Sequence, residues 1–164
     1  MLHVWVEAGI DLPLCRPRDF RVEVTEVEKY TGKGRKASCL PAAYVIRHGV
    51  QDASGDVEFP SELRARRIDV HLRAGWSVRF ELFRENRLSG APLAFAEVDS
   101  RDLARKPRWE LLLSSPPGGE AVYGTARAAP GEGGWGPRRP SRLLVRVSTG
   151  GVEAPPEAPQ RPRP

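Results

Sequence analysis

Hydrophobic and polar residues alternate in short segments along most of this chain. In SVRFEL, the apolar residues Val78, Phe80 and Leu82 alternate with polar ones. A period of two places apolar side chains on one face of a β-strand. The same pattern, or a short apolar run, recurs at Leu2/Val4/Val6/Ala8, Phe20/Val22/Val24, Ala43 to Ile46, Ile68/Val70/Leu72, Leu93/Phe95, Trp109/Leu111/Leu113 and Leu143/Val145/Val147.

These segments are separated by turn residues, such as Gly75 between two of them. Helical periodicity is nearly absent. The single candidate runs from Asp99 to Lys106, where Asp99 or Ser100 would cap one turn. We therefore predict an all-β fold, an antiparallel eight-stranded β-sandwich.

Glycine and proline dominate two segments near the C-terminus. From Pro116 to Pro140, twelve of twenty-five residues are Gly or Pro, which predicts a long flexible insertion before the last strand, with a short strand at Val122 to Ala126 as an option. From Gly150 onward the sequence is Pro-rich, which predicts disorder. The predicted organisation is one domain over residues 1–149, with its insertion at 116–140, and a tail over 150–164.

Five pieces of the sequence, taken in order, carry a resemblance to a known family. They are LHVWVEAGIDLP, RDFRVEVTE, SVRFELFREN, LSGAPLAFAEVDSRDL and RWELLL. Together they resemble strands of the C2 domain, the lipid-binding β-sandwich of synaptotagmins and protein kinase C. The resemblance runs from Leu2 to about Val147, and the stretch from Gly32 to Leu63 departs from the pattern. It implies a C2-like sandwich.

The resemblance also indicates where calcium ligands would lie. C2 domains place an Asp in the first loop, an Asp at the second strand and an Asp-x-Asp pair after the sixth. Asp11 and Asp19 match the first two, but the pair falls on Arg84 and Asn86. Calcium takes six to eight oxygen ligands, and arginine would repel it. We expect a calcium-independent member with no metal and no cofactor. The alternative for RENRLSG, Arg84 to Gly90, is a solvated turn.

The net charge of +5 and the pI of about 9.7 favour an anionic partner. Several cations near an anionic membrane would recruit the chain without calcium. The alternative is a solvated edge strand whose charges block unwanted pairing. The candidate contacts for lipid or an acidic protein are Lys33, Arg35, Lys36, Arg64, Arg66 and Arg67, with further loop contacts at Arg84, Arg87 and Trp135. Trp135 would insert at a membrane, anchor a partner, or fold back on the sandwich.

Signals for catalysis are weak in this sequence. There is no G-x-S-x-G elbow, and TGKGRKASC has the wrong spacing for a phosphate loop. The histidines His3, His48 and His71 show no metal-binding spacing. Cys15 and Cys39 are expected to be reduced thiols, because the N-terminus lacks a secretory signal. We therefore do not expect an enzyme.

The sequence thus predicts a non-enzymatic, calcium-independent C2-like module that docks to anionic phospholipid or to an acidic protein surface. A scaffolding module of the ciliary or centrosomal type, without lipid binding, is the alternative. Nucleic-acid binding and a structural coat subunit are less favoured, since the aromatic residues are not interleaved with the basic strand. The expected location is cytoplasmic, at a membrane periphery or the cytoskeleton.

Overall fold

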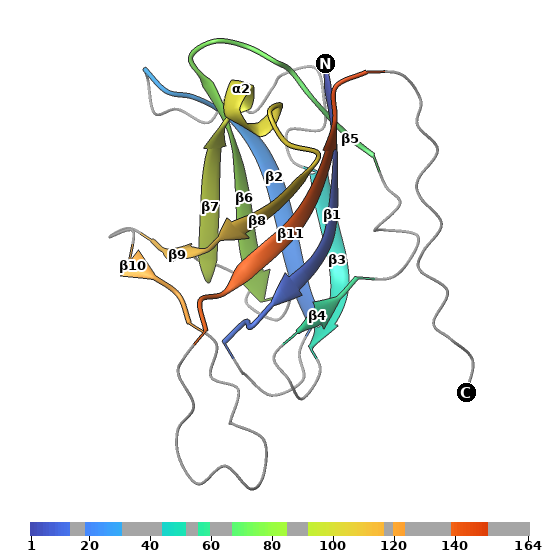
Figure 1. The fold of residues 1–164 in the computed structure, drawn as a ribbon. Coiled ribbons are helices and arrows are strands. Elements are labelled where there is room, and N and C mark those ends of the chain that lie inside the picture. The colour runs from blue at the N-terminus through green and yellow to red at the C-terminus, as the bar shows by residue number, and fades with distance from the viewer. Residues whose placement is uncertain are drawn as a thin grey trace, which may run out of the picture.

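The computed structural model describes residues 1–13, 19–30, 44–51, 56–59, 67–84, 92–116, 120–123 and 139–150. Within these ranges the chain forms strands and one short helix (Figure 1). In chain order they are β1 (Leu2–Ile10), β2 (Asp19–Glu28), β3 (Tyr44–Gln51), β4 (Val57–Glu58), β5 (Ile68–Val70), β6 (Trp76–Arg84), β7 (Ala94–Asp99), α2 (Ser100–Leu103), β8 (Arg108–Leu112), β9 (Ser114–Ser115), β10 (Glu120–Ala121) and β11 (Arg142–Ser148).

The strands pack as two antiparallel layers. One layer has the order β7–β6–β2–β3, and the other is built on β1, β11 and β8, with β5 also paired to β1. β4 pairs with both β1 and β3, so it links the layers along one side. Figure 1 shows β8, β11 and β1 crossing in front of β7, β6 and β2. The predicted all-β sandwich is confirmed. Among the described residues, eight strands have three or more residues and match the eight predicted ones, while β4, β9 and β10 are additional two-residue strands.

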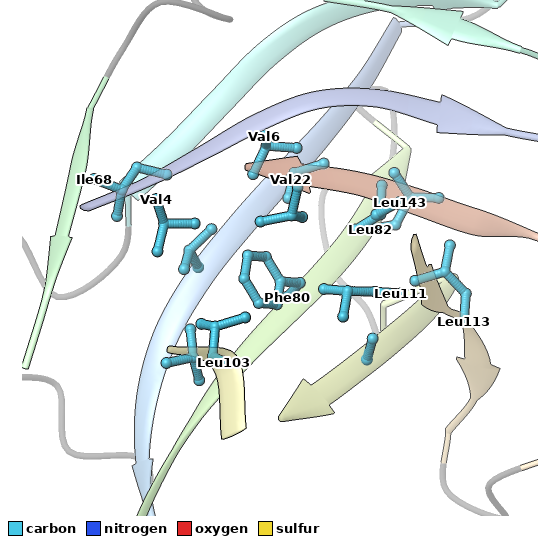
Figure 2. Packing of buried hydrophobic residues seen from close by; sticks show 14 of the residues in the cluster. Val4, Val6, Val22, Ile68, Phe80, Leu82, Leu103, Leu111, Leu113 and Leu143 are labelled. Carbon is cyan, nitrogen blue, oxygen red and sulfur yellow. The ribbon is translucent and has the colours of Figure 1, made fainter. Parts of the chain in front are cut away.

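The core lies between the layers and consists of the residues that the alternation selected in most strands. Val78, Phe80 and Leu82 of β6 are fully buried at its centre, and Leu103 of α2 covers one end (Figure 2). The apolar residues that join them in one cluster are Leu2, Val4, Val6, Leu12, Phe20, Val22, Val24, Val57, Phe59, Ile68, Val70, Ala94, Ala96, Leu111, Leu113, Leu143, Val145 and Val147.

A β-bulge in β1 changes the expected face of its second half. The register against β11 shifts between Val6 and Ala8, because Glu7 is an extra residue opposite the partner strand. The predicted core position Ala8 is therefore wrong, and Gly9 is buried in its place. A Cβ at Gly9 would lie 2.7 Å from Leu12 Cδ1, so glycine leaves room for that buried leucine.

The alternation was also misassigned in β7. Phe95 was expected in the core with Leu93, but Ala94 and Ala96 are the buried residues and Phe95 lies on the outer face. Ala96 is paired directly with Phe80 of β6, so a small side chain accompanies the largest one in the core. Both sets of alternating residues in this segment are apolar, so polarity does not determine which set is buried. The small alanines face the core because the large ring of Phe80 lies beside them.

The predicted helical turn is present. α2 begins at Ser100, and Asp99 caps it by accepting a hydrogen bond at 2.8 Å from the backbone N–H of Arg101. Gly75 forms the predicted turn with a φ of 78°. In the predicted insertion, the short strand lies at Glu120–Ala121, two residues earlier than expected, and Tyr123 pairs with Pro140. Cys15, Cys39 and the residues 124–138 and 151–164 lie outside the described residues.

Glu81 on the outer face of β6 supports a stability prediction. Burial raises its pKa, and the carboxylates of Glu23, directly opposite, and Glu97 add to this, while Arg79 opposes it. A raised folded-state pKa means that protonation stabilises the fold below about pH 4, and that this stabilisation is lost as the pH rises through the folded-state pKa. Glu81→Gln should therefore raise the free energy of unfolding at pH 7 by up to about 1 kcal/mol.

Urea denaturation of both forms at pH 7 and pH 3 measures this difference, which should shrink at the lower pH. Glu97→Gln is the matched control, because Glu97 pairs with Arg79 at 2.9 Å and accepts a hydrogen bond from Ser77. It should lower stability at pH 7. A destabilised Glu81→Gln variant at pH 7 would contradict the electrostatic account.

Candidate functional site

The basic residues predicted to bind an anionic partner are only partly described. Lys33, Arg35, Lys36, Arg64, Arg66, Arg87 and Trp135 lie outside the described residues. Arg67 directly precedes β5, and its Nε lies 2.9 Å from Asp69 Oδ1, which also contacts His3 Nδ1 at 2.7 Å. The charge of Arg67 is therefore partly balanced, which makes it a weaker contact for an anion than the sequence suggested. Arg84 is the last residue of β6, and its backbone pairs with Phe20.

The first of the two aspartates at the calcium-ligand positions has a structural contact. Asp11 adopts a φ of 50° just after β1, and its backbone N–H donates to Asp56 at 3.1 Å. Its carboxylate lies 3.1 Å from Arg142 Nη2, and Arg142 also contacts Glu110 at 3.0 Å. An arginine beside Asp11 holds a positive charge where a cation would have to bind. Asp19 begins β2.

A different group of basic residues gathers at the end of the sandwich that α2 covers. Here the segment from His71 to Gly75 crosses from β5 in one layer to β6 in the other, at the same end as the N-terminus (Figure 1). The buried hydroxyl of Ser100 donates to the carbonyl of Arg73 at 2.7 Å and accepts from the N–H of Arg73 at 3.3 Å. These two bonds fix the crossing segment to α2 and so place Arg73 near the helix.

We call this group the basic end and define it as Arg73, Arg101, Arg105, Lys106 and Arg108. All five side chains are exposed. Arg105 lies 3.4 Å from Asp102, three residues earlier, and both are well exposed, so that pair is weak. Among the described residues, the other four have no carboxylate partner.

The other charges at this end largely balance one another. Lys29 forms a hydrogen-bonded ion pair with Asp99, which lowers the pKa of Asp99 and raises that of Lys29. The backbone N–H of Arg101 lowers the pKa of Asp99 further. Glu26 accepts a hydrogen bond from the N–H of His71 at 2.6 Å, and the side chain of His71 is half-buried. The net positive charge at this end of the sandwich therefore comes from the five residues that define the basic end.

Two tryptophans lie beside these cations. The guanidinium of Arg73 lies 5.7 Å from the ring centroid of Trp76, and Lys106 Nζ lies 4.8 Å from that of Trp109. Both contacts have the geometry of cation–π interactions. Trp109 also packs against the core, as predicted, and its Nε1–H donates to the carbonyl of Leu103 at 3.0 Å. The indoles thus orient two of the basic side chains on the end of the sandwich.

Trp5 is buried on the outer face of β1. Arg146 covers it, with the guanidinium carbon 4.1 Å from the ring centroid. Arg146 also lies 3.3 Å from Glu7, the bulge residue of β1. The indole of Trp5 and the charge of Arg146 are therefore both occupied by contacts within the chain, in contrast to the exposed cations of the basic end.

Within the described residues, no cluster of three or more His, Cys, Asp or Glu side chains is placed to hold a metal ion. In the same part of the chain, no helix has the length and apolar character that crossing a membrane requires.

Comparisons with known proteins add little to the fold. No family model matches the chain, and no curated protein matches it. Among solved structures, sixteen chains match. One is described as "CC2D1B coordinates ESRCT-III activity during the mitotic reformation of the nuclear envelope", with a TM-score of 0.43 and 15% sequence identity, over 89% of this chain and 53% of that one. The present chain thus spans about half of that chain, and a likeness at this TM-score carries no argument about fold or function.

Proposed function

We propose that this chain is a non-enzymatic module that docks to an anionic phospholipid surface, independently of calcium, through the basic end. The observation that carries the proposal is a group of four exposed cations on one end of the sandwich, Arg73, Arg101, Lys106 and Arg108, which have no carboxylate partner within the described part of the chain. Each cation near an anionic membrane contributes about 1 kcal/mol. Four would strengthen binding by roughly a thousandfold, since 1.4 kcal/mol is a factor of ten.

The neighbouring aromatic residues favour a membrane over an acidic protein as the partner. Trp76 and Trp109 are partly exposed and hold Arg73 and Lys106 by cation–π contacts. Tryptophan beside basic residues is typical of surfaces that rest at the level of lipid head groups. The ion pair between Asp11 and Arg142 supports calcium independence, because it places a guanidinium beside a carboxylate that the C2 resemblance would use as a calcium ligand.

Co-sedimentation with vesicles tests this function. We expect binding to phosphatidylcholine vesicles that contain phosphoinositide or phosphatidylserine, no binding to phosphatidylcholine alone, weakening by salt, and no difference between calcium and chelator. Arg101→Glu should reduce binding roughly tenfold or more, because reversing one charge changes the interaction by about two unit charges.

Arg139→Glu is the matched control. Arg139 is also an exposed arginine with no carboxylate partner among the described residues, but it lies next to Pro140 at the opposite end, near the start of β11. Its reversal should have a much smaller effect. Equal losses from both variants would contradict docking through the basic end. Absence of binding to every vesicle would contradict the membrane proposal and leave an acidic protein as the partner.

A further inference from the structure

Two large apolar side chains are exposed at the same end of the sandwich as the basic end. Tyr30, just after β2, is 90% exposed, and Leu72, just after β5, is 48% exposed. The alternation of IDVHL placed Leu72 in the core, so its exposure is a departure from the sequence pattern. Exposed apolar residues that lie next to cations are a property of surfaces that enter a membrane interface.

Leu72 is held outward by its two neighbours. The N–H of His71 is bound to Glu26 at 2.6 Å, and the N–H and carbonyl of Arg73 are both bound to Ser100 Oγ. Because the backbone is hydrogen-bonded on both sides of it, Leu72 is held on the outside of the segment from His71 to Gly75 and does not pack into the core. Its exposure is a consequence of local structure.

Tyr30 is also positioned by the segment from His71 to Gly75. The N–H of Lys29 donates to the carbonyl of Gly75 at 2.9 Å, which joins the end of β2 to the crossing segment. A Cβ on Gly75 would lie 3.1 Å from Tyr30 Cε2, so the absent side chain leaves space for one edge of the ring. The rest of the ring remains exposed. Tyr30 and Leu72 are therefore linked through one segment, which also carries Arg73.

We propose that Tyr30 and Leu72 insert into the interfacial region of the bilayer, so that the sandwich docks end-on, with the basic end contacting the lipid head groups. This inference rests on the proposed function and specifies its contact surface. In this orientation the strands run away from the membrane, and the opposite end, where β1 ends and β11 begins, points away from it (Figure 1). Apolar insertion is not screened by salt, so it accounts for the binding that remains when charge attraction is weakened.

The test compares a paired substitution at this end with a matched one elsewhere. Tyr30→Ser with Leu72→Ser should reduce partitioning onto anionic vesicles about tenfold at moderate salt. The control is Tyr123→Ser with Leu112→Ser, since Leu112 is 61% and Tyr123 45% exposed, on β8 and beside Pro140. The control should change partitioning by less than about twofold. Thermal melts confirm that both variants are folded.

A second measurement reports insertion directly. Leu72→Trp should strengthen vesicle binding, and brominated acyl chains should quench its added fluorescence, whereas Leu112→Trp should show neither effect. The end-on insertion would be overturned if the unaltered protein binds anionic vesicles but the two serine variants partition equally, or if Leu72→Trp shows no added quenching. Either result would leave the proposed function standing. Unaltered protein that binds no vesicle would overturn both.

Discussion

Replacing Phe80 with alanine should lower the free energy of unfolding by about 3–5 kcal/mol. Phe80 is fully buried at the centre of β6, between Val24 of β2 and Ala96 of β7 in the sheet pairing (Figure 2). Its small partner Ala96 cannot fill the space left by the ring, so a cavity would remain. Urea denaturation measured against the unaltered chain gives the difference.

Phe95→Ala is the matched control, because it removes the same side chain one strand away and on the opposite face. Phe95 is only partly buried and lies 5.9 Å below the guanidinium of Arg79. Its loss should cost about 1 kcal/mol, as expected for a partly exposed aromatic contact. Equal costs for the two substitutions would mean that β7 presents Phe95 to the core, contrary to the register described here.

The sequence predicted the strands better than it predicted their faces. The phase was clear in β2, β6 and β11, where most apolar residues fall on one phase and most polar residues on the other. In β7 the residues of both phases are apolar or small, so the pattern alone could not choose between them. In β1 the core phase holds as far as Val6, but the bulge at Glu7 then moves Gly9 to the core. The bulge depends on the register against β11, which the sequence of β1 does not contain.

The candidate site was less predictable because it forms from separated segments. Arg73 lies 28 residues before Arg101, and the hydrogen bonds of Ser100 bring them together. Counting local runs of basic residues pointed instead to Lys33, Arg35 and Lys36 and to Arg64, Arg66 and Arg67, of which only Arg67 lies within the described residues. The run ARKPR, Ala104 to Arg108, was itself a signal, since it places three basic residues at the end of the predicted helical segment and just after it. The balancing of Arg67 by Asp69 depends on side-chain contacts that charge counting does not detect.

The basic end and the core are connected through Leu103. This fully buried residue ends α2, its side chain covers one end of the core, and its carbonyl accepts the hydrogen bond from Trp109 (Figure 2). The packing of Leu103 therefore fixes the helix that carries Arg101 and the indole that orients Lys106. Stability and docking should be coupled at this position.

Leu103→Ala should accordingly lower the free energy of unfolding by about 2–5 kcal/mol and also weaken vesicle binding by the molecules that remain folded. The loss of binding follows because α2 also positions Arg73 through Ser100. Urea denaturation measures the first effect. Co-sedimentation at a temperature where circular dichroism shows a folded chain measures the second.

Leu113→Ala separates the two effects. Leu113 is equally buried, but it lies at the opposite end of the core, where its N–H donates to the carbonyl of Ser141 at 2.9 Å (Figure 2). Its replacement should cost a similar amount of stability and leave vesicle binding by folded protein unchanged. A Leu103→Ala variant that binds vesicles as well as Leu113→Ala would mean that α2 does not position the docking surface, whereas selective loss in Leu103→Ala would tie docking to the packing beneath the basic end.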